Sequence, residues 1–549
     1  MKVFEVACNI VVEEGVDRIF GLMGDGNMSF ITYLTGTLDV PFASSRHEAG
    51  AIGMADGYAR ASGNVGVCTV TQGPGLTNTM TALVTARKAR SPMVLLVGDV
   101  AKAQAGWPQD IDQDAFLAAA GVPVVHLTDA RTAHESVREA FRLARERSAP
   151  VALNCPLDSQ QLEWEPWDVD VERPIEEVAA PLRAPDADVR AAAERLRGAH
   201  RPLIVAGRGA LRAACGPSLR ALGERVGALL ATTLPAKGLF VEDPFNLGIA
   251  GSLGTNLGVS LIGQADVVLA VGAGLNDFTT LKGTLFGESA TIIRFDRYDD
   301  PSPNRYAADL LLIGDARVVV DQLLDELAST ASDAEGWRTD EIGRTLKEYD
   351  VATEFVDQSE VDAIDPRTLM TVLDDILPKN RQIVTDVGHF FGFPATYLRA
   401  GEGGRYMPAV EFGAVGSGLG VAIGAASARP DLLTVLFVGD GGLMMSLPDL
   451  DTAARTKANL VIIVMNDGAY GSELHMLRNW KLVEDAAVFE NPELSVVGAS
   501  LGLRTFRASS VTELRALADK ITPSEGPVLI DCRVTQNVIA GWLEGAFLH

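Results

Sequence analysis

An apolar run that ends in a glycine-rich turn contains the first residues that could do chemistry. Residues 435–438 are Val-Leu-Phe-Val, and Gly439, Asp440, Gly441 and Gly442 follow directly. Such a run is typical of a buried parallel strand that opens into a binding site at its carboxyl end. Glycine lets backbone N–H groups approach a phosphate, whereas the carboxylate of Asp440 would repel one. A diphosphate bound beside Asp440 therefore requires a divalent cation between the two anions.

A second apolar run offers further oxygen ligands for such a cation. Residues 460–465 are Leu-Val-Ile-Ile-Val-Met, and the run ends at Asn466. A right-handed crossover through one intervening helix would place the ends of the two strands side by side. The side chains of Asp440 and Asn466, with the backbone carbonyl of Gly468, then form a ligand set that suits Mg²⁺. Either side chain alone is better explained as a helix cap, but the pair at this spacing favours a metal site.

The length and charge of the chain limit the kind of protein that can carry this site. A chain of 549 residues predicts roughly three or four domains at ~150 residues each. A hydrophobic content of 47% and a charged content of 22% are typical of a soluble globular protein with ample core. The formal net charge of −25 argues against nucleic acids and anionic membranes as partners, and its spread along the chain favours a solvated acidic surface.

The cysteines and the apolar segments exclude further classes. Five cysteines are scattered without a Cys-x-x-Cys pair, so neither a disulfide framework nor a zinc site is expected. The first residues lack the apolar run of a signal peptide, and no apolar stretch approaches the ~20 residues that span a bilayer. We therefore expect a cytoplasmic protein without a membrane partner.

Apolar runs of strand length alternate with helical periods in three parts of the chain. This alternation predicts an α/β fold with three domains, residues 1–165, 186–330 and 366–549, each a mainly parallel sheet flanked by helices. Residues 161–186 are polar and contain prolines, which predicts a linker, and residues 331–365 are predicted to be helical segments and a second linker. The clearest strands are predicted at residues 65–70, 93–97, 203–206, 267–271, 292–295, 382–385, 434–438, 460–464 and 528–530.

The spacing of Gly439, Asp440 and Gly441 from Asn466 resembles the signature of thiamine-diphosphate-dependent enzymes. The order of domains is similar to that of the acetolactate synthase, pyruvate decarboxylase and benzaldehyde lyase superfamily. In that superfamily a pyrimidine-binding domain, a central Rossmann-like domain and a diphosphate-binding domain follow one another. The resemblance covers nearly the whole chain. It implies the ThDP-binding fold, with thiamine diphosphate (ThDP) and Mg²⁺ as cofactors and with Asp440, Asn466 and Gly468 as the metal ligands.

An independent match lies near the N-terminus. An apolar strand is followed by Glu48, which opens a helix of small residues, and this pattern resembles that of the family's catalytic acid. That acid contacts N1′ of the aminopyrimidine and favours the imino tautomer, which removes the C2 proton of the thiazolium. The resemblance implies that Glu48 acts on cofactor held by a second subunit, so a homodimer is the minimum unit and a homotetramer is left open. The alternative is an ordinary first-turn acid stabilised by the helix dipole.

The resemblance also implies further cofactor contacts. In the first domain, residues 71–78 resemble the Gly-Pro-Gly turn beneath the aminopyrimidine, with contacts from Pro74 and Asn78. In the third domain, Val415 takes the place of the apolar wedge under the bent cofactor, a position that is usually Met, Leu or Ile. The remaining implied contacts are Val387, Gly388, His389, Gly413, Gly439, Gly441, Gly442, Ala469 and Tyr470.

The residues that should decide the reaction resemble different subfamilies. Asp25 lies in a loop similar to that of pyruvate-type decarboxylases, and Glu473 falls where those enzymes carry an acid that assists CO₂ loss and protonation. Their adjacent His-His pair is missing. In its region, Gln109 resembles the glutamine of acetolactate synthases and benzaldehyde lyase. His475 is the next candidate after Glu473, and the alternative for Asp25, Gln109 and Glu473 is an ordinary loop or surface residue.

The resemblance implies a non-oxidative enzyme that acts on a 2-oxo acid. ThDP would attack the carbonyl, CO₂ would leave, and the remaining fragment would add to a carbonyl acceptor to give a 2-hydroxy ketone. Gln109 and the missing histidine pair favour this carboligation. The alternatives are a simple decarboxylase that releases an aldehyde, an acyloin lyase of the benzaldehyde lyase type, and a catalytically silent regulatory relative.

The central domain contains one motif of a different class. Residues 205–210 and 272–275 are glycine-containing turns after predicted strands, as in a dinucleotide-binding fingerprint. The third glycine of that fingerprint is absent, and the acidic residue expected ~20 positions further on is not evident. FAD, which some members of the family bind in this domain, is therefore not favoured, and neither is a dinucleotide-dependent oxidoreductase.

Overall fold

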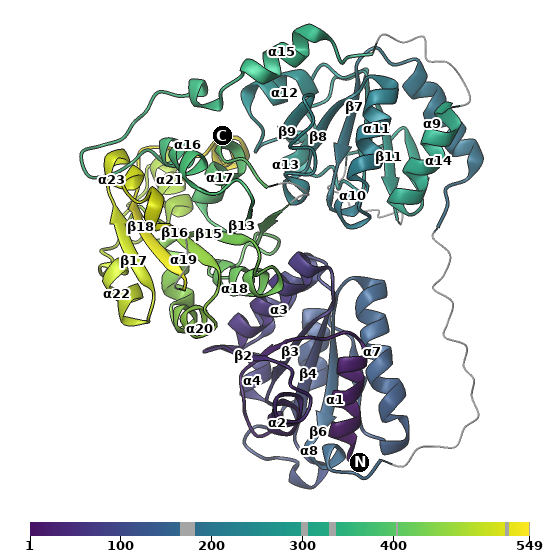
Figure 1. Ribbon diagram of the computed structural model, residues 1–549, viewed down its shortest axis with the longest axis vertical. Coiled ribbons are helices and arrows are strands. Elements are labelled where there is room, and N and C mark those ends of the chain that lie inside the picture. Colours follow the sequence, from purple (N-terminus) through teal and green to yellow (C-terminus); the bar gives the residue numbers. More distant parts are fainter. Residues whose placement is uncertain (165–181, 298–305, 329–335, 402–404, 522–525, 548–549) are drawn as a thin grey trace.

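The computed structural model describes residues 1–164, 182–297, 306–328, 336–401, 405–521 and 526–547. These residues form three six-stranded sheets, and neighbouring strands within each sheet run parallel. Helices make the crossovers that parallel neighbours require, and they cover both faces of each sheet (Figure 1). The predicted fold class is confirmed. In the part of the chain that is described, no helix has the length and apolar character needed to cross a membrane.

The first sheet has the strand order β2-β1-β3-β4-β6-β5. Its strands are β1 (Ile19–Gly21), β2 (Phe42–Ser44), β3 (Gly66–Val70), β4 (Met93–Asp99), β5 (Val124–His126) and β6 (Pro150–Pro156). One face is covered by α1 (Val3–Glu13), α2 (Met28–Gly36) and α7 (Ala133–Arg147). The other face is covered by α3 (Glu48–Ser62), α5 (Met80–Lys88) and α6 (Gln113–Ala120), and it shares a core with the third domain.

The central sheet has the strand order β12-β11-β10-β7-β8-β9. Its strands are β7 (Pro202–Ala206), β8 (Leu229–Thr232), β9 (Asn246–Ile249), β10 (Val267–Val271), β11 (Thr291–Asp296) and β12 (Leu310–Ile313). Helices α9 (Asp186–Arg197), α11 (Gly216–Val226) and α14 (Ala316–Ala328) pack on one face, and α12 (Asn256–Ile262) packs on the other.

The third sheet has the strand order β14-β13-β15-β16-β18-β17. Its strands are β13 (Arg381–Thr385), β14 (Tyr406–Pro408), β15 (Leu433–Gly439), β16 (Leu460–Asn466), β17 (Arg504–Ala508) and β18 (Val528–Arg533). Helices α18 (Gly418–Ala428) and α20 (Asp449–Arg455) pack on the face toward the first domain, and α16 (Pro366–Ile376) and α23 (Val511–Arg515) pack on the opposite face. Because β15 is buried on both faces, it is apolar at every position from 435 to 438.

Each strand predicted from the sequence is present, with ends that differ by a few residues at most. Residues 165–181 of the predicted first linker lie outside the described residues. The predicted second linker contains α15 (Asp340–Glu348) and a 3-10 helix (Val351–Glu354). Between β15 and β16 the chain forms two short helices, α19 (Asp440–Ser446) and α20, instead of the single helix expected from the sequence. Pro448 explains the break, because proline cannot continue a helix.

The first and third domains meet through two helices of small residues, α3 and α18, which lie side by side (Figure 1). A Cβ added at Gly57 would lie 1.9 Å from the Val421 carbonyl oxygen, and one at Gly424 would lie 1.8 Å from that of Met54. The two backbones therefore touch, and a single hydrophobic core extends across both sheets. This contact fixes the position of Glu48, the first residue of α3, relative to the third domain.

Candidate active site

The predicted metal ligands lie at the carboxyl ends of two neighbouring strands of the third sheet. Gly439 of β15 pairs with Met465 of β16, so the residues that follow them, Asp440 and Asn466, are adjacent. Both side chains are buried. The strands position them because each strand is apolar on both faces, and the first polar side chain after each one comes at the edge of the sheet.

A hydrogen-bond network directs the oxygens of these two side chains toward one point. The Asn491 side-chain amide donates to Asp440 Oδ2 and, at 3.3 Å, to Asn466 Oδ1. Arg533 Nη1 donates to the same Asn466 oxygen at 2.8 Å, while Asn466 Nδ2 donates to Asp531 Oδ1 at 2.8 Å. Because they share a donor, the two oxygens border the same small volume, which is the arrangement that a common cation needs.

The third predicted ligand, Gly468, lies against Asp440. Its N–H donates to Asp440 Oδ2 at 3.0 Å, and its carbonyl accepts a hydrogen bond from the Phe489 N–H at 2.9 Å. Gly468 has a φ of 68°, a left-handed conformation that glycine adopts at little cost. Within the described ranges, no cluster of three or more His, Cys, Asp or Glu side chains could hold a metal ion. The predicted site therefore depends on an amide and a carbonyl oxygen beside one carboxylate.

Two buried carboxyl groups make this edge of the sheet suitable for a cation. Burial raises the pKa of Asp440. Burial also raises the pKa of Asp467, and the neighbouring charge of Asp440 raises it further. A divalent cation would oppose both shifts, because it stabilises the ionised form of each carboxyl group. The residues present thus fit a divalent metal ion.

Asp386, which follows β13, holds the loop that carries the predicted wedge residue. Its Oδ2 accepts from Gly416 N at 2.8 Å, and its Oδ1 accepts from Gly418 N at 3.0 Å. Burial raises the pKa of Asp386 to about 6, and backbone N–H groups act in the opposite direction. Val415 is thereby held at the edge of a cavity with 42% of its surface exposed. Asp386 is not among the residues predicted from the sequence, although it follows a buried strand just as Asp440 does.

The cavity at this edge of the sheet is lined by most of the third-domain residues whose cofactor contacts the resemblance implies. They are Val387, Gly388, His389, Val415, Gly439, Asp440, Gly441, Gly442, Ala469 and Tyr470. Glu473, in the first turn of α21 (Gly471–Trp480), also lines the cavity. Gly413 is exposed in the same loop as Val415.

Two neutral histidines lie side by side at the cavity, His389 in its wall and His475 behind it. The rings of His389 and His475 are 4.4 Å apart between centroids. Burial lowers the pKa of His475 to about 4 and holds the pKa of His389 well below its usual value. His389 Nε2 accepts from Ala540 N at 2.8 Å. His475 packs against His389 and is not among the residues that line the cavity, whereas Glu473 is both at the cavity and exposed to solvent.

In the first domain, Glu48 is buried at the first turn of α3. Its Oε2 accepts a hydrogen bond from Asn78 Nδ2 at 3.0 Å. Asn78 follows α4 (Pro74–Thr77), the short helix that Pro74 begins. Three of the residues predicted to contact the aminopyrimidine are therefore neighbours, although the turn and the helix are separated in the sequence.

The structure also brings Asp25 and Gln109 together, through Gln72, which is not among the predicted site residues. Gln72 Nε2 donates to Asp25 Oδ1 at 3.0 Å and to Gln109 Oε1 at 2.8 Å. Thr71 Oγ1 donates to the same Asp25 oxygen at 3.0 Å. Gln72 lies just before the glycine of the Gly-Pro-Gly turn, so this polar cluster adjoins Pro74.

Within one chain, the residues around Glu48 are separated from the cavity beside Asp440. The cavity is lined by residues of the third domain alone. The start of α3 contacts α20, where Asp449 Oδ1 accepts from Arg46 N at 2.9 Å. Figure 1 shows the same arrangement, with α3 next to α18 and α20. The two groups of predicted site residues therefore lie in different places within the chain.

Three family models match the chain, in the order of its three sheets. "Thiamine pyrophosphate enzyme, N-terminal TPP binding domain" matches residues 1–116, which include Glu48. "Thiamine pyrophosphate enzyme, central domain" matches residues 189–323. "Thiamine pyrophosphate enzyme, C-terminal TPP binding domain" matches residues 386–532, which include Asp440 and Asn466.

Known proteins are similar to the chain along nearly its whole length. It is 30% identical to the probable acetolactate synthase large subunit of Methanocaldococcus jannaschii, over 97% of this chain and 91% of that protein. It is 28% identical to the acetolactate synthase isozyme 2 large subunit of Escherichia coli (strain K12), over 95% of this chain and 94% of that protein. The chain therefore belongs to the acetolactate-synthase-like superfamily of thiamine pyrophosphate enzymes, and it is a ThDP-dependent enzyme.

Proposed function

We propose that this enzyme uses ThDP and Mg²⁺ to decarboxylate a 2-oxo acid and to join the remaining fragment to a carbonyl acceptor, giving a 2-hydroxy ketone. The observation that carries the proposal is the similarity along nearly the whole chain to proteins named acetolactate synthase large subunits. A simple decarboxylase and an acyloin lyase are the alternatives, since all three reactions need the same cofactor site and differ at the substrate.

The third domain would hold the cofactor. Asp440, Asn466 and the Gly468 carbonyl would bind Mg²⁺, and the turn at residues 439–442 would admit the diphosphate beside the metal. This turn depends on its glycines, because a Cβ at Gly441 would lie 2.8 Å from the Tyr470 ring. When bound, ThDP supplies a nucleophilic carbon and an electron sink for the loss of CO₂.

We propose that the working unit is at least a homodimer. The cavity beside Asp440 and the carboxylate of Glu48 are separated within one chain, so a second chain would supply Glu48 to each cavity. Exposed apolar side chains lie at and beside the cavity: Val415, which lines it, is 42% exposed, and Met445, which lines the adjacent pocket, is 58% exposed. Such exposure is typical of a surface that a partner covers.

In such a dimer, different side chains would carry out the proton transfers and the substrate contacts. Glu48, oriented by Asn78, would hold the proton at N1′ of the aminopyrimidine. Glu473 would face the bound substrate as the proton donor. Asp25 and Gln109, joined by Gln72, would contact the substrate from the partner's first domain. The buried pair His389 and His475 is neutral, so it would serve to shape the cavity wall.

We also propose that the central domain works without FAD. The glycines of its fingerprint-like turn serve in packing, because a Cβ at Gly207 would lie 2.2 Å from the Gly272 carbonyl oxygen. The absorbance spectrum of the purified protein tests this directly. A flavin spectrum would contradict it.

Product analysis tests the reaction. The enzyme is incubated with pyruvate, ThDP and Mg²⁺, with and without an added aldehyde, and the products are identified by NMR. A 2-hydroxy ketone that incorporates the acceptor is expected. Free aldehyde as the sole product under both conditions would instead establish the simple decarboxylase. In a parallel incubation with an acyloin as the substrate, cleavage of the acyloin in preference to its formation would establish the lyase.

A further inference from the structure

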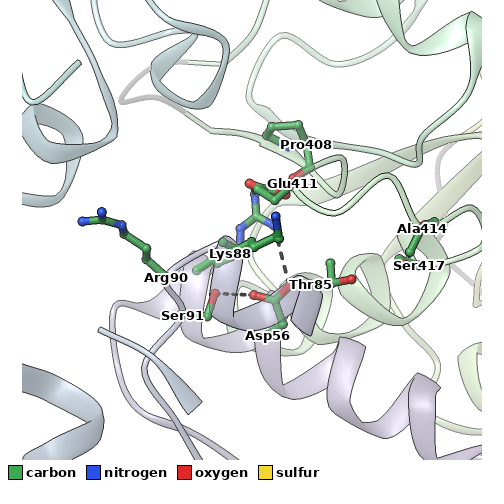
Figure 2. Close-up of polar contacts among 12 residues, drawn as sticks. Asp56, Thr85, Lys88, Arg90, Ser91, Pro408, Glu411, Ala414 and Ser417 are labelled. Atoms are coloured by element: carbon green, nitrogen blue, oxygen red, sulfur yellow. Dashed lines mark hydrogen bonds and ion pairs between the residues drawn. The ribbon is translucent and has the colours of Figure 1, made fainter. Parts of the chain in front are cut away.

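A buried cluster of charged side chains lies where the three domains meet. Four side chains form this three-domain ion cluster: Asp56 and Arg60 of α3, Arg208 of α10 (Arg208–Arg212) in the central domain, and Glu411 of the third domain. Glu411 Oε1 lies 3.1 Å from Arg208 Nη2 and 3.5 Å from Arg60 Nη2, and Arg60 Nη1 lies 3.7 Å from Asp56 Oδ2. Figure 2 shows Glu411 and Asp56 in this cluster, with Ser91 donating to Asp56.

Three members of the cluster are buried and Arg208 is partly exposed. The exposed fraction of the side chain is 2% for Asp56, 8% for Glu411, 10% for Arg60 and 25% for Arg208. Burial lowers the pKa of Arg208, while the nearby Glu411 raises it, and an arginine remains charged under such conditions. Removing one partner from a buried ion pair leaves an uncompensated charge, so each member of this cluster depends strongly on the others.

Glu411 is the residue of the cluster that is connected to the active site. It begins the loop of residues 411–418, which contains Gly413 and the cavity-lining Val415. Asp386 holds the far end of this loop from within the third domain. The near end is held from outside, because both ion-pair partners of Glu411 come from other domains. The remaining oxygen of Glu411, Oε2, is buried without a hydrogen-bond partner among the described residues.

Arg208 is presented by the glycine-containing turn of the central domain. A Cβ at Gly207 would lie 2.2 Å from the Gly272 carbonyl oxygen, and one at Gly209 would lie 2.8 Å from Gly272 Cα. The two glycines therefore let neighbouring turns touch, and this contact fixes the start of α10. Arg208 then extends to the other domains, where Nη1 donates to the Lys88 carbonyl at 3.1 Å and Nη2 donates to Glu411.

We infer that Arg208 and Arg60 are positioning residues for the cofactor loop, and that the central domain sets the affinity for ThDP through the contact between Arg208 and Glu411. The inference rests on the proposed role of Val415 beneath the cofactor. Removing Arg208 leaves the buried carboxylate of Glu411 with only the longer contact to Arg60, and removing the carboxylate leaves both arginines without their partner on the loop. In either case the near end of the loop is no longer held to the central domain, and Val415 would leave its position at the cavity.

Titration of ThDP into the full-length protein with Mg²⁺, followed by calorimetry, tests this inference. Arg208→Gln and Glu411→Gln are each expected to raise the Kd for ThDP by about tenfold. The double variant should be no weaker than the worse single variant, because both substitutions remove the same contact. Arg208→Lys keeps the charge but cannot reach Lys88 and Glu411 together, so it should give a smaller increase.

Arg212→Gln is the matched control. Arg212 lies on the same helix and crosses the same domain boundary, but it donates to the backbone carbonyls of Ala89 and Arg90 and makes no hydrogen bond or ion pair to Glu411 within the described residues. It should leave the Kd for ThDP within twofold of the wild-type value. Folded Arg208→Gln and Glu411→Gln proteins with wild-type affinity, or a control that weakens equally, would overturn the inference. Tight ThDP binding without 2-hydroxy ketone formation would contradict only the proposed reaction.

Discussion

Glu48 lies at the first turn of α3, where burial and the hydrogen bond from Asn78 fix its carboxylate. Replacing Glu48 by Gln keeps the size of the side chain and an oxygen that can accept the hydrogen bond from Asn78, but it removes the ionisable group. We expect Glu48→Gln to lower kcat by about 10²- to 10⁴-fold, since a positioned acid or base contributes that much. The affinity for ThDP, measured by calorimetry, should change little because the diphosphate is held elsewhere. A variant with wild-type turnover would refute the assignment.

The Asp440→Ala variant should differ from Glu48→Gln, because it should lose cofactor binding itself. Asp440 is the charged member of the predicted ligand set, so Asp440→Ala should lose Mg²⁺-dependent ThDP binding, with the Kd raised at least about 100-fold. Titrations with and without EDTA measure the metal-dependent part. In the wild-type protein EDTA should have the same effect as the substitution, and in the variant it should add nothing. Unchanged affinity in the variant would place the metal elsewhere.

For Glu473, a substitution can distinguish a role in turnover from a role in ThDP binding. Glu473 lines the cavity and is exposed in a single chain, which suits a proton donor that a partner subunit covers. Glu473→Gln should lower kcat by ~10²-fold or more with ThDP affinity unchanged. His475→Asn is the comparison, since His475 packs behind the cavity and should affect stability more than turnover. A Glu473→Gln enzyme that retains most of its turnover would contradict the role as proton donor.

At the scale of elements, the contact between α3 and α18 determines where Glu48 lies. Gly57→Ala would place a Cβ 1.9 Å from the Val421 carbonyl oxygen, so the two helices must separate. We expect a loss of about 1–3 kcal/mol in the free energy of unfolding, measured by chemical denaturation. Gly36→Ala, in α2, is the matched control because its Cβ meets no atom within 4 Å. Equal free energies of unfolding for the two variants would contradict the prediction, because they would show that close packing of α3 on α18 does not contribute to stability.

At the scale of the whole molecule, the separation of Glu48 from the cavity leads to a complementation experiment. Glu48→Gln and Asp440→Ala chains should each be inactive. A mixed dimer would contain one site with both an intact Asp440 and an intact Glu48, so random mixing should restore about a quarter of the wild-type activity. The chains are mixed, subunit exchange is verified by mass spectrometry, and activity is assayed. Activity that stays at the level of the parents after exchange would show that each chain completes its own site.

The strands illustrate how much of the fold can be predicted. Strands β15 and β16 are long, apolar and buried on both faces. They can be predicted from the sequence because a continuous apolar run of this length is typical of a buried strand in a parallel sheet. Strands β1, β2 and β5 have three residues each and are not among the predictions. Too few residues remain in such a strand to establish a period, so its pairing depends on the neighbouring strands.

The residues of the candidate site also differ in whether a local pattern in the sequence predicts them. The sequence predicts Asp440 and Asn466 because each comes at the end of a long apolar strand, and it predicts Glu48 through the resemblance to the family's catalytic acid. Asn491 and Arg533 could not be predicted, since their side chains reach Asp440 and Asn466 from segments whose distance in space depends on the completed sheet. Gln72, which joins Asp25 to Gln109, was missed for the same reason.

The sequence by itself determined the α/β class, the longer buried strands such as β15 and β16, and the residues at the ends of those two strands. These features are local, because hydrophobic period and strand–turn chemistry act over a few neighbouring residues. Only the tertiary structure decided that Arg208 and Arg60 meet at Glu411. Those contacts join residues hundreds of positions apart. They arise from the packing of whole helices, such as α3 on α18, and packing at that range leaves no periodic signal in the chain.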